Sequence, residues 1–403
     1  MKDQRKFIHF HCFVFLFIIY PFTLSSTEYL TIGGEKHGWE VSVHPDRGTI
    51  KQFRQLMGDV WETIPFRDDS LAGPAWSGMQ LCPSKKQLYV FEAHQGDIYY
   101  TLRYKAAYDH LIVECTISNR GDDVFRPEYS RLFIGVDSEM KTYPDWDTKF
   151  FPTLLRCEKD FAWGYFMSPR QIIMGIGVEE PVASYTLNYV YEGSMEWKWG
   201  HQIKTGSLDL LHCLPLPERH PQNNISLKPH ETRKWTLHLG VVDRLAGVKE
   251  KLSQWIQAPM IECEKYTMAG HETSRLLIHS QSGLEKLIVK APDGTQSVLP
   301  VDGVADNVYS ALFSPSSQKG LYRITATAIN GKTAEAGIYI RNPWSWYMKN
   351  ARDFVARNPP LFSNGCEAFY GYYTAFLGAR HFPETSVDSI LEKRFNRTLP
   401  FFI

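Results

Sequence analysis

Hydrophobic and polar residues alternate along several stretches between residues 28 and 243, with the two-residue period of half-buried strands. In 110–119, Leu111, Val113, Cys115 and Ile117 alternate with mostly polar neighbours. Similar stretches are 97–104, 171–178, 182–191 and 234–242. Because many strands with few helices in one block form a sandwich, we predict a large antiparallel β-sandwich over 27–243.

The hydrophobic period changes after this block. Over 244–258 the apolar residues Leu245, Val248, Leu252 and Ile256 recur at helical spacing. This spacing predicts a helix that connects two domains.

A second block with strand periodicity covers 259–341. Strand-like stretches are 275–279, 286–290 and 321–328. Asn330-Gly331 lies between two alternating runs, where this dipeptide is a strong signal for a tight hairpin turn. A length of about eighty residues is typical of an immunoglobulin-like sandwich.

The pattern from 342 to 403 is helical. Asn342 is placed to cap a first helix, with Pro343 as its first residue, and Pro359-Pro360 ends it. Asn364 and Glu367 have the spacing of a capping box at the start of a second helix.

The second helix is apolar and aromatic nearly all round. Its large residues are Phe369, Tyr370, Tyr372, Tyr373, Phe376 and Leu377. A third apolar stripe lies within 387–398. Such a helix needs cover on every side, and too few residues follow to supply it. We therefore predict that 342–403 begins a helical domain whose remainder is missing.

The N-terminus has the features of a signal peptide over 1–26. Basic residues precede an apolar run at 13–22, and small residues suitable for cleavage follow. We expect a secreted protein, periplasmic in a bacterium, with no stable membrane insertion after cleavage because the run is short for a membrane span. An uncleaved anchor is the alternative.

The charge balance and the absence of known motifs narrow the possible partners and cofactors. Lys+Arg and Asp+Glu number 44 each, so no overall field points to nucleic acid as a partner. There is no phosphate-binding loop, dinucleotide fingerprint or metal-ligand spacing, and we predict no cofactor and no metal. The aromatic content is 14%, which is consistent with large β cores or with platforms for sugar rings.

Three stretches resemble a known kind of enzyme: TYPDWDTKFFPTLLRCEKDFAWGYFMSP (142–169), LDLLHCLPLPERHP (208–221) and SNGCEAFYGYYTAFL (363–377). They are similar to secreted Bacteroidetes glycan-degrading enzymes, in which a galactose-mutarotase-like supersandwich precedes an (α/α) toroid. The resemblance implies that 27–243 is the supersandwich, that 342–403 holds the first helices of a truncated toroid, and that catalytic groups come mainly from the toroid.

Within that resemblance, Glu367 is the candidate catalytic carboxylate. Glycoside hydrolysis needs two carboxylates across the scissile bond, and the second would lie beyond residue 403. A reciprocal cap with Asn364 is the alternative role for Glu367. Asn364 is also a candidate for sugar binding.

Aromatic and basic residues supply the other binding candidates. Trp344 and Trp346 are candidates for a sugar platform, or for a wedge between domains. Tyr370 and Tyr373 lie one turn apart and would line a sugar pocket, supply a phenol as the acid of a lyase, or pack in a core. Arg156 would pair with a uronate carboxylate or form a structural salt bridge.

The function predicted from the sequence is hydrolysis of uronate-containing polysaccharide or oligosaccharide. A polysaccharide lyase that works by β-elimination and an inactive sugar-binding fragment are the alternatives. A structural or adhesion protein is a third class, and the aromatic helical start after residue 341 speaks against it.

Overall fold

The structure is a computed structural model of the 403-residue chain. It describes residues 28–66, 70–71, 76–83, 85, 87–134, 151–168, 172–191, 201–213, 222–316, 318–358 and 367–398. The predicted signal peptide and Asn364 therefore lie outside the described residues.

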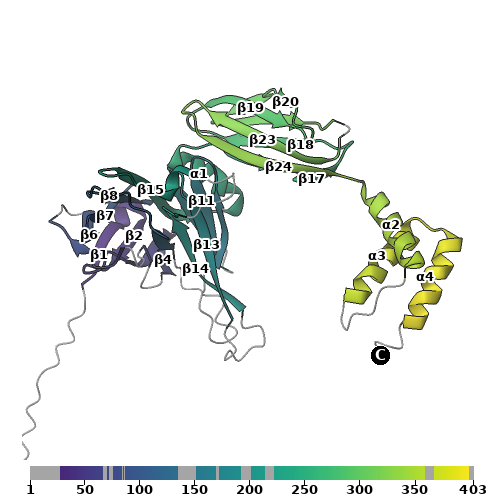
Figure 1. Cartoon of the computed structure of the whole chain (residues 1–403), viewed down its shortest axis with the longest axis horizontal. Coiled ribbons are helices and arrows are strands. Elements are labelled where there is room, and N and C mark those ends of the chain that lie inside the picture. The colour runs from purple at the N-terminus through teal and green to yellow at the C-terminus, as the bar shows by residue number, and fades with distance from the viewer. Residues whose placement is uncertain are drawn as a thin grey trace, which may run out of the picture.

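A large β-sandwich holds the N-terminal half of the described chain, as predicted (Figure 1). Its first sheet has the order β1-β2-β3-β4, with β1 Leu30–Gly34, β2 Trp39–Val43, β3 Ile50–Met57 and β4 Val60–Pro65. A small sheet has the order β13-β14-β9, with β9 Arg131–Ile134, β13 Ser184–Tyr191 and β14 His201–Asp209.

The largest sheet runs β10-β11-β12-β15-β8-β7-β6-β5 through the same domain. Its strands are β5 Gln80–Leu81, β6 Leu88–Gln95, β7 Ile98–Ala106, β8 Leu111–Asn119, β10 Phe151–Cys157, β11 Ala162–Met167, β12 Ile173–Val178 and β15 Thr232–Val242. Leu111, Val113, Cys115 and Ile117 on β8 are fully buried, which confirms the alternation in the sequence. They join residues of the other two sheets, such as Trp39, in one core.

The predicted connector is a short 3-10 turn, η5 Leu245–Gly247, followed by helix α1 Val248–Ile256. Helix α1 lies directly on the backbone of the largest sheet, at glycines of β12 and β15. A Cβ atom on Gly177 would lie 2.4 Å from Cγ2 of Ile256, and one on Gly240 would lie 2.8 Å from the Trp255 ring. Two further 3-10 turns are η1 Glu35–His37 and η4 Gln222–Ile225.

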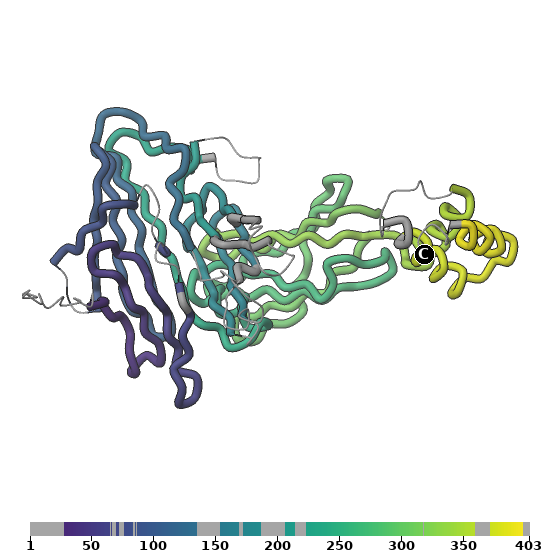
Figure 2. The backbone as a smooth tube through the Cα atoms, turned by 90° about the horizontal axis from the view of Figure 1, so that it is seen from below, coloured from purple at the N-terminus to yellow at the C-terminus, as the bar shows by residue number. Residues whose placement is uncertain are grey.

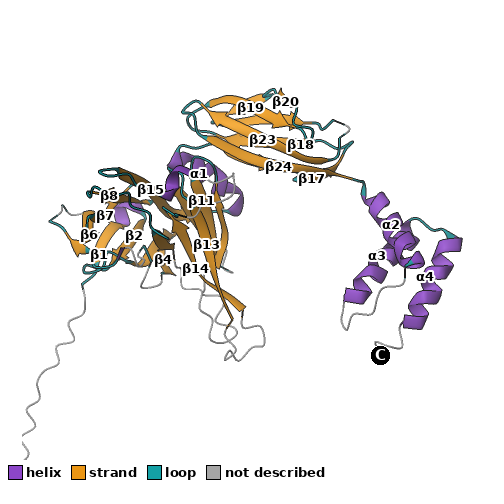
Figure 3. Cartoon of the chain, viewed as in Figure 1, coloured by secondary structure: helices purple, strands orange, loops and turns teal. Residues whose placement is uncertain are grey.

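A smaller sandwich of two sheets follows, as the sequence predicts (Figure 3). One sheet is β16-β18-β22-β21, with β16 Met260–Cys263, β18 Ser274–His279, β21 Gly303–Ala305 and β22 Val308–Phe313. The other is β17-β24-β23-β19-β20, with β17 Thr267–Ala269, β19 Leu284–Lys290, β20 Gln296–Val298, β23 Gly320–Ala328 and β24 Thr333–Arg341. The predicted Asn330-Gly331 hairpin joins β23 to β24, with Gly331 at φ 87° and its N–H bonded to the Ala328 carbonyl at 2.9 Å.

The junction between the two sandwiches belongs to the same buried apolar cluster as the core of the small sandwich. This cluster contains Phe161, which precedes β11, and Trp163 on β11. It also contains residues of α1 and of the inner faces of the small sandwich. The limits of the domains stay predictions, but the junction between these two parts is packed like an interior.

Three helices end the described chain: α2 Trp344–Arg357, α3 Glu367–His381 and α4 Thr385–Thr398. They have a core of their own around Tyr372, Ala375 and Leu391, against which Phe376 and Phe395 pack. In two views the helices lie at the end of the small sandwich that is far from the large one (Figures 1 and 2).

The predicted cap of α2 is wrong. Pro343 stays extended, with ψ 154°, so the helix begins at Trp344 and no side chain caps it. The Asn342 side chain instead accepts a hydrogen bond from Nζ of Lys319. Tertiary contact with the preceding β-hairpin thus outweighs the local cap.

Two further observations concern the cysteines and the helices. Cys115 and Cys263 are buried thiols, whereas Cys82 and Cys213 are half-buried and Cys366 lies outside the described residues. In the part of the chain that is described, no helix combines the length and the apolar character that a membrane crossing requires.

Candidate functional site

Trp344 and Trp346 form an exposed aromatic group at the start of α2. Their side chains are 62% and 46% exposed. Both rings contact Tyr347, with centroids 5.9 Å and 5.0 Å away, and the Arg341 guanidinium lies 4.3 Å from the Trp344 ring. The interpretations of these tryptophans as a sugar platform and as a wedge between domains both stay predictions. Exposed indole faces are the apolar surface on which the C–H face of a sugar stacks.

Tyr373 on α3 points away from the core of the helical group. It is 68% exposed, whereas its neighbour Tyr372 is 2% exposed and packs edge-on against Phe395 at 5.3 Å. Tyr373 is thus outside the core that these three helices form, and its predicted roles in a sugar pocket, as a lyase acid or in a core stay predictions. The phenol of Tyr373 stays a candidate for contact with a sugar or for proton donation.

The structure does not describe the side chains of Glu367, Tyr370 and Asn364. Glu367 and Tyr370 belong to helix α3, which begins at Glu367. Their side chains, and Asn364 as a whole, lie outside the described residues. The catalytic role of Glu367 and its alternative as a cap both stay predictions.

Arg156 on β10 lies at the junction of the two sandwiches. Its Nε lies 2.5 Å from Oε1 of Glu158, and Nη2 donates to the carbonyl of Glu335 on β24. Glu158 is 8% exposed and also accepts hydrogen bonds from Nε1 of Trp163 at 3.5 Å and from the N–H of Glu335 at 3.4 Å. Burial raises the pKa of the Glu158 carboxyl, and the charge of Arg156 opposes that rise. Binding of a uronate by Arg156 stays a prediction beside this structural role.

Arg156 and the tryptophans do not form one site. Arg156 contacts β24 at Glu335, and Trp344 follows the last residue of that strand, Arg341. Six residues of extended strand separate these two points, which is roughly 20 Å at a rise of about 3.4 Å per residue. The predicted binding residues therefore belong to at least two places.

A row of hydrogen-bonded polar side chains lies beneath α1, and its two histidines, His110 and His238, are buried. His110 Nε2 and His238 Nδ1 are 2.8 Å apart, and each imidazole ends on a carboxylate, Asp109 or Glu179, at 2.8 Å. Lys251 on α1 pairs with Asp109 at 2.6 Å. Burial lowers the pKa of His110, and the hydrogen bond with His110 lowers that of Asp109. This row of polar side chains connects α1 to the largest sheet, and no residue spacing in the sequence predicts it.

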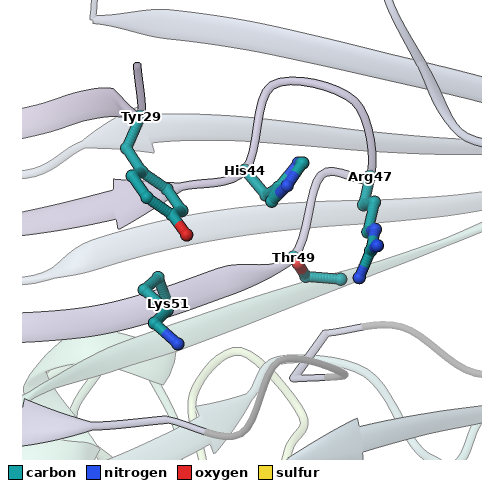
Figure 4. A pocket seen from close by; sticks show the side chains of 5 residues that line it. All are labelled: Tyr29, His44, Arg47, Thr49 and Lys51. Carbon is teal, nitrogen blue, oxygen red and sulfur yellow. The ribbon is translucent and has the colours of Figure 1, made fainter. Parts of the chain in front are cut away.

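A pocket of about 210 Å³ lies on the first sheet and is lined by Tyr29, His44, Arg47, Thr49 and Lys51 (Figure 4). Tyr29 precedes β1, His44 follows β2, and Thr49 and Lys51 lie just before and on β3. The pairing of Leu30 with Val43 and of Val43 with Ile50 brings these strand ends side by side.

Sequence reasoning missed this pocket. The signal was the turn sequence HPDRGT between two alternating runs, in which Pro, Asp and Gly mark a hairpin and basic residues flank it. A short turn with exposed charge is common, so the signal is weak until the register shows which side chains meet. Among the described residues, no three His, Cys, Asp or Glu side chains are placed to hold a metal ion.

The chain resembles known proteins in its structure and not in its sequence. No protein-family model matches the chain, and no curated protein matches it in sequence. The structure is similar to that of a polysaccharide lyase, with a TM-score of 0.63 and 14% identity over 88% of this chain. The match covers 58% of the lyase, so this chain spans little more than half of that protein's length. The chain therefore has the fold of the corresponding part of a polysaccharide lyase.

Weaker similarities involve the large sandwich. A galactose mutarotase related enzyme from Lactobacillus acidophilus matches 54% of this chain with a TM-score of 0.34 and 6% identity, over 98% of its own length. A GalM/aldose epimerase homologue from C. elegans matches 54% with a TM-score of 0.32 and 10% identity, over 99% of its length. TM-scores this low do not define a fold by themselves.

Proposed function

We propose that this chain belongs to an enzyme that degrades uronate-containing polysaccharide. The observation that carries the proposal is the similarity in fold to a polysaccharide lyase over 88% of the chain, through both sandwiches and into the helices. The exposed Trp344, Trp346 and Tyr373 support it, because they offer aromatic surface beside the small sandwich.

The reaction we propose first is β-elimination. A base removes the proton at C5 of the uronate, the C4–O bond breaks, and a C4=C5 double bond forms while the leaving oxygen takes up a proton. A positive group on the carboxylate favours the loss of the C5 proton, because it stabilises the negative charge that develops. Tyr373 is our candidate for proton transfer on the helices, since an exposed phenol both donates and accepts.

Hydrolysis, the reaction predicted from the sequence, is distinguished by its products. Elimination gives an unsaturated uronate that absorbs in the ultraviolet, and hydrolysis gives a new reducing end without a double bond. The remaining features of the proposed lineage are secretion to the periplasm and a toroid that begins at α2.

The first experiment incubates the full chain with glucuronate-, galacturonate- and mannuronate-containing polysaccharides, and measures ultraviolet absorbance, reducing ends and binding. We expect binding of at least one polymer, and unsaturated product wherever the chain cleaves it. Reducing ends without absorbance would replace elimination by hydrolysis. Neither product nor binding on the whole panel would overturn the proposal.

Variants test the aromatic surface directly. Trp344→Ala with Trp346→Ala should weaken binding of the polymer about tenfold, a loss of about 1.4 kcal/mol, because two stacking faces are removed. The matched control is Tyr108→Ala, since Tyr108 is an 88% exposed ring on the large sandwich. Equal binding by the double variant and the control would remove the tryptophans from the site.

A further inference from the structure

We propose that the pocket of Tyr29, His44, Arg47, Thr49 and Lys51 binds an oxyanion carried by a sugar, either the carboxylate of a uronate or a sulfate ester. This is a second binding site, since the pocket lies on the first sheet of the large sandwich and the exposed tryptophans lie beyond the small one. That the anion is carried by a sugar rests on the proposed function; that the pocket binds an oxyanion rests on its own geometry.

The groups that line the pocket donate hydrogen bonds or carry positive charge. Arg47 and Lys51 are cationic, and Tyr29 and Thr49 present hydroxyl groups. His44 accepts the N–H of Asp46 at Nδ1 over 3.2 Å, so the neutral ring carries its proton on Nε2 and donates from there. None of the five lining residues is a carboxylate, and the acidic neighbour in the loop is Asp46. Such a lining favours an anion.

The loop that carries Arg47 is fixed by the core beneath it. The His44 N–H bonds to the Thr49 carbonyl at 2.8 Å, and the Gly48 N–H bonds to the His44 carbonyl at 2.9 Å. The buried Tyr104 hydroxyl donates to the Gly48 carbonyl. Gly48 has φ 66°, and a Cβ there would lie 2.9 Å from the Phe91 ring, so no larger residue fits.

The pocket walls are ordered in the same way. Thr49 is 5% exposed, so its backbone and side chain are held by neighbours. The rings of Tyr29 and His44 meet edge to face at 5.7 Å. Figure 4 shows the Tyr29 hydroxyl and the Lys51 amine on one side, with Thr49 and Arg47 on the other. Thr49, Tyr29 and His44 are therefore held in place, which favours binding, whereas Arg47 and Lys51 are exposed side chains.

Size and chemistry select the ligand. The volume of about 210 Å³ is below the roughly 300–1,000 Å³ of pockets for drug-sized molecules, so one sugar unit fits better than a long segment of chain. Arginine binds the two oxygens of a carboxylate or a sulfate as a fork, and the hydroxyl donors suit the remaining oxygens. A neutral sugar gives the two cations no charge to bind.

A second site has a consequence for a polymeric substrate. A polysaccharide held at this pocket and at the tryptophans is bound at two points, so its effective concentration at each rises. We expect the pocket to increase affinity for long anionic chains more than for single sugars.

The test is a calorimetric titration of the full chain with glucuronate, glucose, glucose 6-sulfate and inorganic sulfate. We expect binding of glucuronate or of glucose 6-sulfate, and whichever binds identifies the source of the oxyanion. Glucose should bind at least tenfold more weakly. Equal affinity for glucose, or no binding of glucuronate, glucose 6-sulfate or inorganic sulfate, would overturn the proposal. Binding of inorganic sulfate alone would overturn its sugar part.

Variants assign the binding to the pocket. Arg47→Met with Lys51→Met should reduce affinity for the anionic sugar at least tenfold, and Thr49→Val should reduce it less. The matched control is Arg323→Met with Lys290→Met, which removes the same two charge types from exposed strand positions of the small sandwich. Unchanged thermal midpoints would show that the variants fold, and unchanged affinity in the pocket variant would refute the assignment.

The two proposals fail separately. Binding of the anionic sugar is measured without turnover. If the chain is inactive but still binds the sugar, the proposed pocket stands and the proposed reaction is refuted. If the chain is active, and the pocket variant binds and degrades the polymer as the parent does, the proposed reaction stands and the proposed pocket is refuted.

Discussion

At the scale of single residues, Arg156 and Glu158 show how a buried charge holds two parts of the chain together. Glu158 is almost fully buried between the sandwiches, and Arg156 is the cation beside it. Removing one partner of a buried pair leaves the other charge unpaired, which costs more than the pair contributes. The Arg156–Glu158 pair therefore stabilises the junction between the two sandwiches.

We expect Arg156→Met to lower the free energy of unfolding by about 2 kcal/mol at pH 7. This is less than the roughly 3–5 kcal/mol for a fully buried pair, because the Arg156 side chain is 36% exposed. Adding Glu158→Gln should recover most of the loss, since no charge is then left in the junction. The measurement is urea denaturation, with Arg103→Met, an exposed surface pair, as a control expected to change by about 0.5 kcal/mol or less.

The same carboxyl predicts a dependence on pH. The folded-state pKa of Glu158 is raised above its usual 4.5, so between these two values the folded protein binds more protons than the unfolded one. Its contribution to stability therefore falls as the pH rises through that window, and Glu158→Gln should remove this fall.

If Arg156→Met left stability unchanged but abolished uronate binding, the structural role of the Arg156–Glu158 pair would be contradicted. The predicted role of Arg156 in binding would then stand.

At the scale of elements, the position of helix α1 depends on residues that have no side chain. Gly175 and Gly177 on β12 and Gly240 on β15 leave room for Leu252, Ile256 and Trp255 to rest on the sheet. The helix thereby reaches both sandwiches at once, and its residues belong to the buried cluster at their junction. Glycine normally weakens a strand, so its presence here follows from packing.

We expect Gly177→Ala to lower the free energy of unfolding by about 1–3 kcal/mol, although alanine is the better strand residue. The added Cβ would lie 2.4 Å from the branched Ile256 side chain, so the helix or the strand must shift. Gly270→Ala is the control, because the nearest atom there lies 3.8 Å away. Equal denaturation midpoints for the two variants would show that α1 does not need this close approach.

At the scale of the whole molecule, the described chain has two apolar cores that meet in the sandwiches and a third in the helices. Arg352, which is 2% exposed, organises the helical group. It pairs with Glu384 at 2.9 Å and donates to the carbonyl of Phe382, so it ties α2 to the turn before α4. The helices therefore have contacts for a cooperative unit of their own.

We expect unfolding in two steps, with the amides of α2, α3 and α4 losing protection from hydrogen exchange before those of β8 and β15. Gly378→Ala should shift the first step only, because a Cβ there would lie 2.3 Å from the Met348 carbonyl oxygen where α2 and α3 cross. The control on the same helix is Gly371→Ala, whose Cβ meets Val355 at 3.8 Å. It should stabilise the helices by roughly 0.5–1 kcal/mol through helix propensity. A single transition that Gly378→Ala shifts as a whole would contradict this division.

The sequence alone determined the class of each segment, because burial on one face imposes a period of two on strands and of 3.6 on helices. It therefore predicted the large sandwich, α1, the Asn330-Gly331 hairpin and the helical end. It also named Trp344, Trp346 and Tyr373, which the structure leaves exposed.

Tertiary structure decided which side chains meet. The pairing of β1, β2 and β3 brings Tyr29, His44 and Lys51 around one pocket. The docking of β24 brings the Glu335 carbonyl to Arg156, and Lys319 binds the Asn342 side chain that was expected to cap α2. These contacts join residues far apart in the chain, and a local period carries no information about them. Periodicity fixes which face of an element is buried, whereas register and docking fix what that face touches.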